Sequence, residues 1–285
     1  MKSNAKVKKR FRAGVFFGRF FLYLFLILLA VICATPFYIM IINATRPSFE
    51  ITQGLSLIPG HNIVQNYRNM IVATPIWQGF KNSLIIAVSS TILSGYFGAL
   101  TAYAFSKFRF KGNKVLFWFV LVTMMIPPQL GLIGYFMLCI KLHLINTYWA
   151  LILPTIATAA TVFFIKMYMD ANIDIALLEA ARIDGGSEFY IFNRIVLPIA
   201  MPAVAVMSLL NFIFSWNNYL SPLVLLMEKK KFTLPILIAL VKGVYKQDFG
   251  AQYLAVAISI VPIMIAFMFF SKYIISGITA GALKE

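Results

Sequence analysis

Long apolar segments constrain the fold of this chain more than any other feature of its sequence. The run from Val15 to Ile42 alone exceeds the ~20 apolar residues that a helix needs to cross a bilayer. Hydrophobic residues make up 61% of the chain and charged residues 12%, whereas a soluble domain carries roughly 25% charged residues. The sequence therefore predicts an all-α integral membrane protein.

Six transmembrane helices are predicted from the apolar runs. The first is expected to be an uncleaved span, because its apolar run is longer than that of a signal peptide. The piece from Leu234 to Val241 is too short to cross a bilayer, and we expect an interfacial or re-entrant helix there. The expected membrane domain, residues 15–275, lies between a basic segment (1–14) and a tail (276–285), with spans at about 15–42, 82–105, 115–140, 148–169, 199–226 and 251–275.

Two of these spans carry features that bear on helix packing. The second is rich in small residues, among them Ser94, Gly95 and Gly98. Small residues let membrane helices pack closely, so we expect this span inside the bundle. The third contains Pro127-Pro128, and two prolines break the helical hydrogen-bond ladder in mid-membrane. The break indicates either a packing kink or part of the wall of a transport pathway.

The positive charges fit a membrane protein better than a nucleic-acid-binding protein. The net charge is +16, but the basic residues lie between apolar runs and form no clustered face. With the N-terminus in the cytoplasm, sixteen Lys and Arg residues fall inside and nine outside, in agreement with the positive-inside tendency. The cluster Lys229-Lys230-Lys231 disagrees, but early spans usually dominate topology. Both termini are therefore predicted to be cytoplasmic.

One long polar passage, residues 170–198, separates the fourth and fifth predicted spans. A first helix is expected to stop at the turn Asp184-Gly185-Gly186, because glycine readily adopts the left-handed conformation that ends helices. Ser187 is expected to cap a second helix, with Glu188 near the positive end of its dipole. Pro198 is expected to end that helix. Two short amphipathic helices joined at a glycine corner would suit docking into a groove.

The motif in this passage resembles that of a known family. Glu179-Ala180-Ala181, Gly185, and Ile195 with Leu197-Pro198 are similar in spacing to the EAA loop of permease subunits of binding-protein-dependent ABC importers. The resemblance implies a six-helix type I importer permease, in which this loop is a cytoplasmic coupling helix seated in a cleft of a separate ATPase subunit. The residues implied to couple to the ATPase are Glu179, Ala180, Ala181, Asp184, Gly185 and Gly186. The alternative is an ordinary helix-turn-helix connection between two spans.

Other passages resemble the carbohydrate branch of that family, in particular its smaller maltose-type permeases. Asn82-Ser83-Leu84 is similar to the second-span pattern, Met125-Ile126-Pro127 to the third, and Trp216-Asn217 to the fifth. An acidic residue often follows the last motif in that branch, whereas this chain has Asn218. The resemblance implies import of a sugar or oligosaccharide, with a non-sugar substrate as the alternative. The tail residues implied to contact the ATPase are Thr279, Ala280 and Gly281.

The resemblance also implies partners and a location. No Gly-x-x-x-x-Gly-Lys phosphate loop occurs in the sequence, so ATP and Mg are expected on two partner ATPase subunits. This chain is expected to bind no cofactor and to be no enzyme. The other expected partners are a second, different permease, an extracytoplasmic solute-binding protein and membrane lipid, but no nucleic acid. The implied location is the bacterial cytoplasmic (inner) membrane, which the chain crosses several times.

Polar and aromatic residues within the spans are candidates for a substrate pathway. Four of them form an unusually polar cluster within the fifth predicted span. Aromatic faces and amide groups suit a neutral ligand rich in hydroxyl groups. The same residue types also suit hydrogen bonds between helices and anchoring at the membrane interface. The candidates are Trp216, Asn217, Asn218 and Tyr219, with Gln129 and Tyr135 from the third span.

Two other function classes are disfavoured. A secondary transporter would carry ionisable residues within its spans for ion or proton coupling, whereas almost every Asp and Glu lies outside them. A membrane hydrolase would need a nucleophile, a base or a metal cluster. Cys33, Cys139, His61 and His143 form no metal-type spacing.

Overall fold

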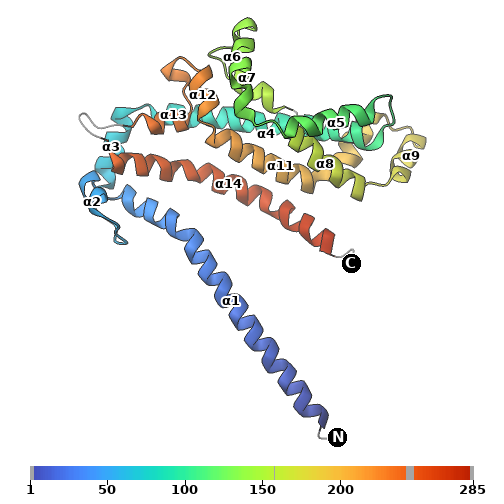
Figure 1. The fold of residues 1–285 in the computed structure, drawn as a ribbon, viewed down its shortest axis with the longest axis horizontal. Coiled ribbons are helices and arrows are strands. Elements are labelled where there is room, and N and C mark those ends of the chain that lie inside the picture. Colours follow the sequence, from blue (N-terminus) through green and yellow to red (C-terminus); the bar gives the residue numbers. More distant parts are fainter. Residues whose placement is uncertain (1–2, 157, 242–246, 283–285) are drawn as a thin grey trace. The chain divides into compact units, whose positions relative to one another are not determined.

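The computed structural model describes residues 3–156, 158–241 and 247–282, with side chains for 15–156, 158–241 and 247–273. This part of the chain is helical and contains no strand (Figure 1). Five of its helices are long and apolar enough to cross a membrane, and a bent helix pair would make a sixth span. The predicted class, an all-α integral membrane protein, is confirmed.

The helices follow one another along the chain with short connections. They are α1 (Ser3–Ala44), α2 (Ser48–Gln53), α3 (Ile63–Ala73), α4 (Ile76–Lys107), α5 (Asn113–Met124), η1 (Pro128–Gly131), α6 (Leu132–Lys141), α7 (Trp149–Ile152), η2 (Leu153–Thr155), α8 (Ala159–Asn172), α9 (Ile175–Ile183), α10 (Glu188–Ile191), η3 (Phe192–Val196), α11 (Leu197–Asn217), α12 (Leu220–Leu225), η4 (Lys229–Lys231), α13 (Leu234–Ala239) and α14 (Phe249–Ala282).

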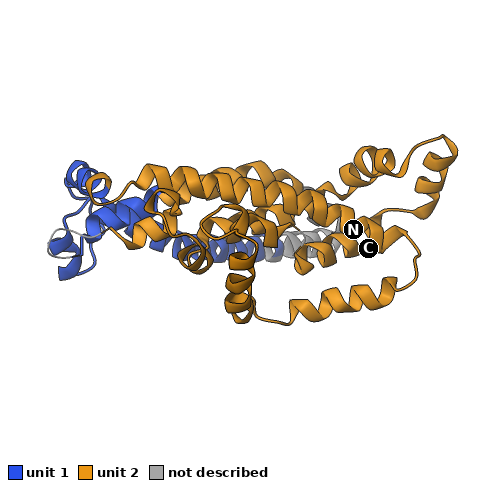
Figure 2. Ribbon diagram, turned by 90° about the horizontal axis from the view of Figure 1, so that it is seen from above, with its two compact units in different colours: residues 1–70, 242–258 blue, residues 71–241, 259–285 orange. Residues whose placement is uncertain are grey.

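The chain divides into two compact units, coloured separately in Figure 2. Unit 1 comprises residues 1–70 and 242–258, and unit 2 comprises residues 71–241 and 259–285. Unit 2 holds the polar passage that the sequence singles out and all the candidate substrate residues. The functional analysis therefore concerns unit 2.

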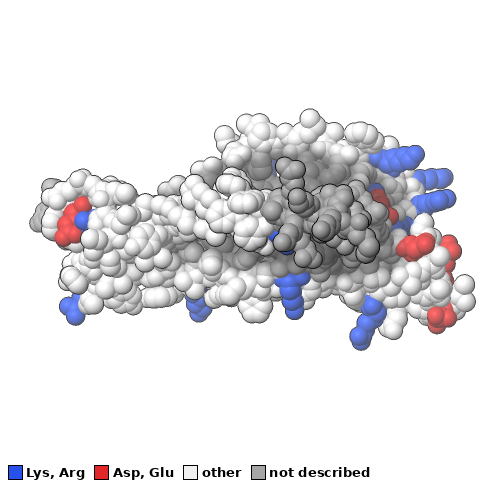
Figure 3. Space-filling model, turned by 90° about the horizontal axis from the view of Figure 1, so that it is seen from below, with Lys and Arg blue, Asp and Glu red and all other residues white. Residues whose placement is uncertain are grey.

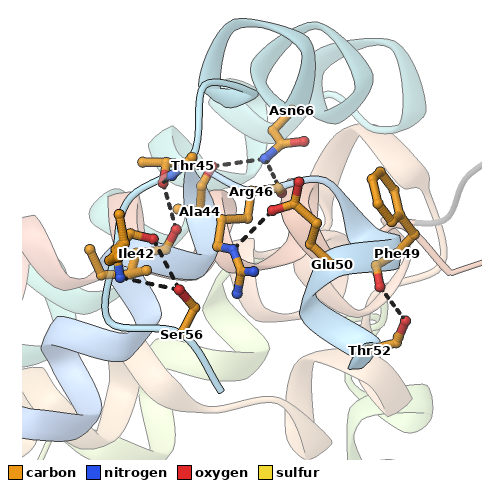
Figure 4. Close-up of polar contacts among 11 residues, drawn as sticks. Ile42, Ala44, Thr45, Arg46, Phe49, Glu50, Thr52, Ser56 and Asn66 are labelled. Carbon is orange, nitrogen blue, oxygen red and sulfur yellow. Dashed lines mark hydrogen bonds and ion pairs between the residues drawn. The ribbon is translucent and has the colours of Figure 1, made fainter. Parts of the chain in front are cut away.

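Polar contacts hold unit 1 together beyond the C-terminal end of α1. The Asn66 amide of α3 donates to the carbonyl oxygens of Ala44, at 2.8 Å, and Arg46, at 3.0 Å (Figure 4). The Arg46 guanidinium pairs with Glu50 of α2 at 3.1 Å. Asp248, just before α14, accepts hydrogen bonds from side chains of α2 and α3 at 3.0 and 2.7 Å. These contacts fix the short helices α2 and α3 between the long helices of this unit.

Unit 2 is built around α4, which packs against α8 and α11. Its small residues are buried on the side that faces these helices. A Cβ atom on Gly95 would come within 2.6 Å of Ser208 Oγ of α11, and one on Gly98 within 2.6 Å of Thr161 Cγ2 of α8. The absence of a side chain at these two positions is what lets the backbones approach. The expectation that this span lies inside the bundle is confirmed.

Enlarging Gly98 should therefore destabilise unit 2. We expect Gly98→Val to lower the thermal stability of the detergent-solubilised protein by about 1–3 kcal/mol, because the added methyl groups overlap Thr161 in a packed interface. Gly134→Val is the matched control, since the space around Gly134 of α6 is open. Equal melting temperatures for the two variants would contradict the close packing of α4 on α8.

The third predicted span is broken in the middle. Helix α5 ends at Met124, Pro127 is extended with ψ 126°, and Pro128 begins η1. The two halves, Asn113–Met124 and Pro128–Lys141, differ in direction by 96°. This bend is larger than a packing kink, because two successive prolines lack the N–H groups that would continue the ladder.

Two expected helix ends are wrong. The fifth span was expected to run to residue 226, but α11 ends at Asn217, Asn218 is extended, and α12 is a separate helix. Pro198 was expected to end the helix that Ser187 begins, but the chain continues from α10 through η3 into α11. Pro198 lies in the first turn of α11, and η3 is a π-helical turn. That turn changes the hydrogen-bond register just before the proline, so the missing N–H does not stop the helix.

Candidate functional site: the loop between α8 and α11

The polar passage forms a short helix, a glycine turn and a second helix, as the sequence predicts. Asp174 precedes and caps α9, and its carboxylate accepts a hydrogen bond from the Ala176 N–H at 3.0 Å. Leu178 points inward and is buried, whereas Glu179 and Ala180 are exposed. Ile183, the last residue of α9, is also fully solvent-facing, with 86% of its surface exposed. Helix α9 thus turns one side to unit 2 and the other outward.

The turn after α9 depends on Gly185. Its φ is +83°, in the left-handed region that residues with a Cβ avoid. The N–H groups of Gly185 and Gly186 donate to the carbonyl oxygens of Arg182, at 3.0 Å, and Ala181, at 2.9 Å. Ser187 then accepts a hydrogen bond from the N–H of residue 190 at 3.3 Å and caps the second helix. The backbone groups at both helix ends are therefore satisfied locally.

A side-chain network joins this loop to the end of α4. Glu188 accepts a hydrogen bond from the Tyr103 hydroxyl at 2.9 Å and from Arg182 Nε at 2.6 Å. The Arg182 guanidinium also lies over the Phe108 ring, 5.9 Å from its centre. The hydrogen bond to Glu188 raises the pKa of Arg182 above its usual value. One carboxylate thus connects the last turn of α9, the first turn of α10 and the C-terminal end of α4.

The sequence did not reveal this network. Glu188 was expected only to favour the helix dipole, and neither Tyr103 nor Arg182 was a candidate residue. The sequence offered one signal: two side chains that donate hydrogen bonds and one carboxylate that accepts them, in a mostly apolar chain. Tyr103 and Glu188 are 85 residues apart, so no local pattern could pair them.

Apolar packing next to the Glu188 network holds the loop against the rest of unit 2. Phe192 is fully buried between the rings of Tyr96 and Tyr103, with ring centres 5.6 and 5.7 Å away. Leu178 belongs to the same buried cluster. At the beginning of the loop, Lys107 Nζ donates to the Ile173 carbonyl oxygen at 2.6 Å. The loop is therefore anchored to α4 by buried packing and by a hydrogen bond.

The outer surface of the loop carries both charged and apolar side chains. Glu179, Asp184 and Arg182 provide charge, while the exposed Ala180 and Ile183 provide an apolar contact area. Figure 3 shows Lys, Arg, Asp and Glu side chains gathered at the end of unit 2 that carries α9. An exposed face of this kind, on a loop packed onto unit 2, is suited to contact with another protein.

The candidate substrate residues do not form one site. Tyr135 and Asn218 line a cavity of 720 Å³ among α6, α7, α8, α11 and α12. Asn217 and Tyr219, with Trp216, line a separate recess of 270 Å³ beside α13. Gln129 is exposed and belongs to neither.

Trp216 is held by packing. Only 1% of its surface is exposed, and its indole N–H donates to the Ser259 carbonyl oxygen at 3.0 Å. Its ring lies 5.4 Å from that of Phe80 and 5.9 Å from that of Phe212, centre to centre. These contacts join α4, α11 and α14 within unit 2.

The remaining candidates concern metals and the tail. Among the described residues, no group of three or more His, Cys, Asp or Glu side chains could hold a metal ion. Thr279, Ala280 and Gly281 fall in the last turns of α14, and their side chains lie outside the described residues.

The fold and this loop together define a class of protein: a helical membrane protein with a polar helix–turn–helix loop whose outer side is exposed. The chain belongs to the family of binding-protein-dependent transport system inner membrane components, whose family model matches residues 94–280. That match includes the whole loop. The family predicted from Glu179-Ala180-Ala181 and Gly185 is confirmed, and a secondary transporter or a hydrolase is not supported.

Individual relatives match over nearly their full length. The arabinooligosaccharides transport system permease protein AraQ of Halalkalibacterium halodurans is 37% identical, over 90% of this chain and 93% of the relative. The trehalose/maltose transport system permease protein MalG of Thermococcus litoralis is 36% identical, over 90% and 94%. Among solved structures, a chain of a bacterial ABC transporter that imports the acidic polysaccharide alginate has the same fold, with a TM-score of 0.76 at 23% identity, over 92% of this chain and 98% of that one.

Proposed function

We propose that this chain is the membrane-spanning permease subunit of an ATP-driven importer for a sugar or oligosaccharide, which an extracytoplasmic binding protein delivers. The observation that carries the proposal is the full-length similarity to permeases named for arabinooligosaccharides and for trehalose and maltose. The neutral linings of the two recesses near α11 agree with an uncharged substrate. A permease for a non-sugar substrate has no comparable support.

The loop α9–α10 is proposed to be the contact with the ATPase. The chain has no phosphate loop of its own, so ATP and Mg are bound by two partner ATPase subunits. The outward face of α9 fits a cleft in such a partner, where Glu179 pairs with a cation and the small side chain of Ala180 allows close approach, while Ala181 packs against unit 2. The turn at Asp184, Gly185 and Gly186 sets the direction of α9 against α10.

Movement of the ATPase is then passed to the membrane helices through Glu188. Because this carboxylate is bonded to Tyr103 of α4, displacement of α9 displaces α4 and the helices packed on it. The cycle requires two states of the bundle, one favoured by ATP at the loop and the other by the absence of nucleotide, with the loaded binding protein acting on the opposite side. Import is therefore coupled to hydrolysis without any catalytic residue on this chain.

The proposal also covers the location, the partners and the substrate side. Both termini lie in the cytoplasm of a bacterial cell, the chain crosses the inner membrane several times, and a second, different permease completes the pathway. Tail residues Thr279, Ala280 and Gly281 make an additional ATPase contact. On the substrate side, Tyr135 and Asn218 border the larger cavity, and Asn217 and Tyr219 the smaller recess.

Co-purification tests the proposal. The chain, expressed with its genomic neighbours, is expected to isolate with two ATPase subunits and one further permease. The reconstituted assembly is expected to take up a sugar only with ATP inside and binding protein outside. ATP hydrolysis by the purified chain alone would contradict the division of labour. Failure of the complete assembly to import any of arabino-oligosaccharides, maltose, trehalose and diacetylchitobiose would contradict the sugar assignment.

A further inference from the structure

The loop between α4 and α5, together with the first turn of α5, carries cations that the protein itself does not neutralise. This loop lies at the end of unit 2 that carries α9 (Figure 1). Arg109, Lys111 and Lys114 are exposed, and none of them pairs with a carboxylate among the described residues. Two neighbouring cations, Lys107 and Lys166, are bonded within the protein. Three positive charges therefore remain available to a ligand from outside the chain.

Hydrogen bonds and ring contacts hold this loop in place. The side-chain amide of Asn113 donates to the Phe108 carbonyl oxygen at 2.9 Å, and the Phe110 ring lies 6.2 Å from that of Phe105, centre to centre. Helix α5 begins after Gly112, and no side chain caps its N-terminus. Because the N-terminal end of a helix carries partial positive charge, it adds to the attraction of the three cations for an anion.

Helix α5 also presents an apolar stripe that no described part of the chain covers. Val115, Trp118, Phe119 and Val122 follow the i, i+3, i+4, i+7 spacing of one helix face. Each of these side chains is between 52% and 73% exposed. The other side of the helix packs on α8, where the Phe117 ring is stacked on a phenylalanine ring 6.3 Å away. The stripe thus begins next to the cations and continues along the membrane span.

An anionic phospholipid complements both features at once. Its acyl chains cover an apolar stripe on a membrane helix, and its phosphate meets the basic residues at the end of that stripe. A free phosphate ion would leave the stripe uncovered, and a zwitterionic lipid would bring a further positive charge to the cations. A protein partner would have to supply acidic side chains here, although charged residues are depleted in the cores of protein interfaces.

We propose that the α4–α5 loop and the apolar stripe of α5 form a binding site for an anionic phospholipid. The phosphate contacts Arg109, Lys111 and Lys114, and an acyl chain lies along the stripe as far as Val122. The proposal requires only that the chain spans a membrane, and it does not depend on the transported solute. It accounts for the three cations that remain unpaired while their neighbours on α4 and α8 are bonded within the protein.

The test measures which lipid lies along α5 in the complete assembly, reconstituted in liposomes of phosphatidylcholine. Val122→Cys, in a chain with Cys33 and Cys139 replaced by serine, carries a fluorophore, and an assembly with the cysteine-free chain gives the background. Equal small amounts of phosphatidylglycerol or phosphatidylcholine with a nitroxide on the acyl chain are added as quenchers. We expect phosphatidylglycerol to quench at least about fivefold more effectively, which corresponds to roughly 1 kcal/mol of headgroup attraction.

Neutralising the cations is expected to remove this preference. In a variant that combines Arg109→Gln, Lys111→Gln and Lys114→Gln, the two nitroxide lipids should quench equally. Quenching by phosphatidylcholine should stay at its original level in this variant, because α5 still lies in the bilayer. That second measurement separates loss of the headgroup contact from loss of the fold.

The matched control removes three other exposed cations and changes the net charge equally. It combines Lys141→Gln, Lys229→Gln and Lys230→Gln and is expected to keep the preference for phosphatidylglycerol. Equal quenching by both lipids when all the cations are present would overturn the proposal, since α5 would then contact only unselected boundary lipid. Absence of quenching by either lipid would also overturn it, because another subunit would cover the stripe. The same holds if the preference survives neutralisation of the α4–α5 loop or is lost in the control.

Discussion

Replacing Gly185 by valine is expected to abolish sugar import while leaving the protein inserted in the membrane. Gly185 has a φ of +83° and no atom within 4 Å of the position that a Cβ would take. The obstacle is therefore the backbone conformation alone, which costs a non-glycine residue about 1–3 kcal/mol. A β-branched residue would relieve this strain by opening the turn, and α9 would then point away from its direction against α10. We expect ATP-driven uptake to fall more than tenfold.

Gly112→Val supplies the matched control for this prediction. Gly112 has a similar φ of +88° and equally open surroundings, but it precedes α5, outside the loop between α8 and α11. The strain is thus the same and only the position differs. Membrane yield and uptake of both variants would be measured in the same assembly. Normal uptake by Gly185→Val, or equal losses in the two variants, would contradict the role of this turn in coupling.

Removing the Glu188 carboxylate should impair coupling much more than stability. In Glu188→Ala, both Tyr103 and Arg182 lose their carboxylate partner, so α9 keeps its apolar packing on unit 2 but loses its polar link to α4. The ion pair itself is partly exposed, with side-chain exposures of 35% and 45%. Pairs of this kind contribute only about 0–1 kcal/mol to stability. We expect a small change in melting temperature, but uptake at least about tenfold lower per ATP hydrolysed, since the mechanical link is lost.

Two further variants separate the link to α4 from the general effect of losing an exposed ion pair. Tyr103→Phe removes only the hydroxyl group and is expected to show a similar loss of uptake per ATP, because it breaks the link to α4 and leaves the Arg182 pair intact. Glu228→Ala removes a comparably exposed ion pair, with Lys231, far from the loop in the sequence, and is expected to transport normally. A loss confined to melting temperature in Glu188→Ala would indicate that Glu188 only holds the loop in shape.

Local features of the sequence predicted the helices and the turn well. The left-handed Gly185 and the Ser187 cap depend on residues at most four positions apart, and both appear in the structure as expected. The apolar runs also predicted an all-α membrane protein. Hydropathy could not find the end of α11, because apolar residues continue on both sides of the polar cluster at residues 215–219, within which Asn218 turns away from the helix. Pro198 led to the opposite error, a helix end predicted where the helix continues, because the π-helical turn η3 accommodates the proline.

The parts of the site that were missed depend on contacts between distant segments. Trp216 looked like a substrate residue, because a polar cluster in a span usually faces a pathway, yet Ser259 satisfies its N–H 43 residues later. In the same way, only the packing of α4 against the loop brings Tyr103 to Glu188.

Cross-linking tests the central claim, that the outward face of α9 contacts the ATPase, most directly. With Cys33 and Cys139 replaced by serine, Ala180→Cys provides one exposed thiol on α9. A short thiol-to-amine cross-linker, added to inside-out vesicles that contain the whole assembly, should join this chain to an ATPase subunit, and the yield should change when ATP is bound. Absence of that product, together with labelling of the same thiol by a membrane-impermeant reagent from the extracytoplasmic side, would contradict the account.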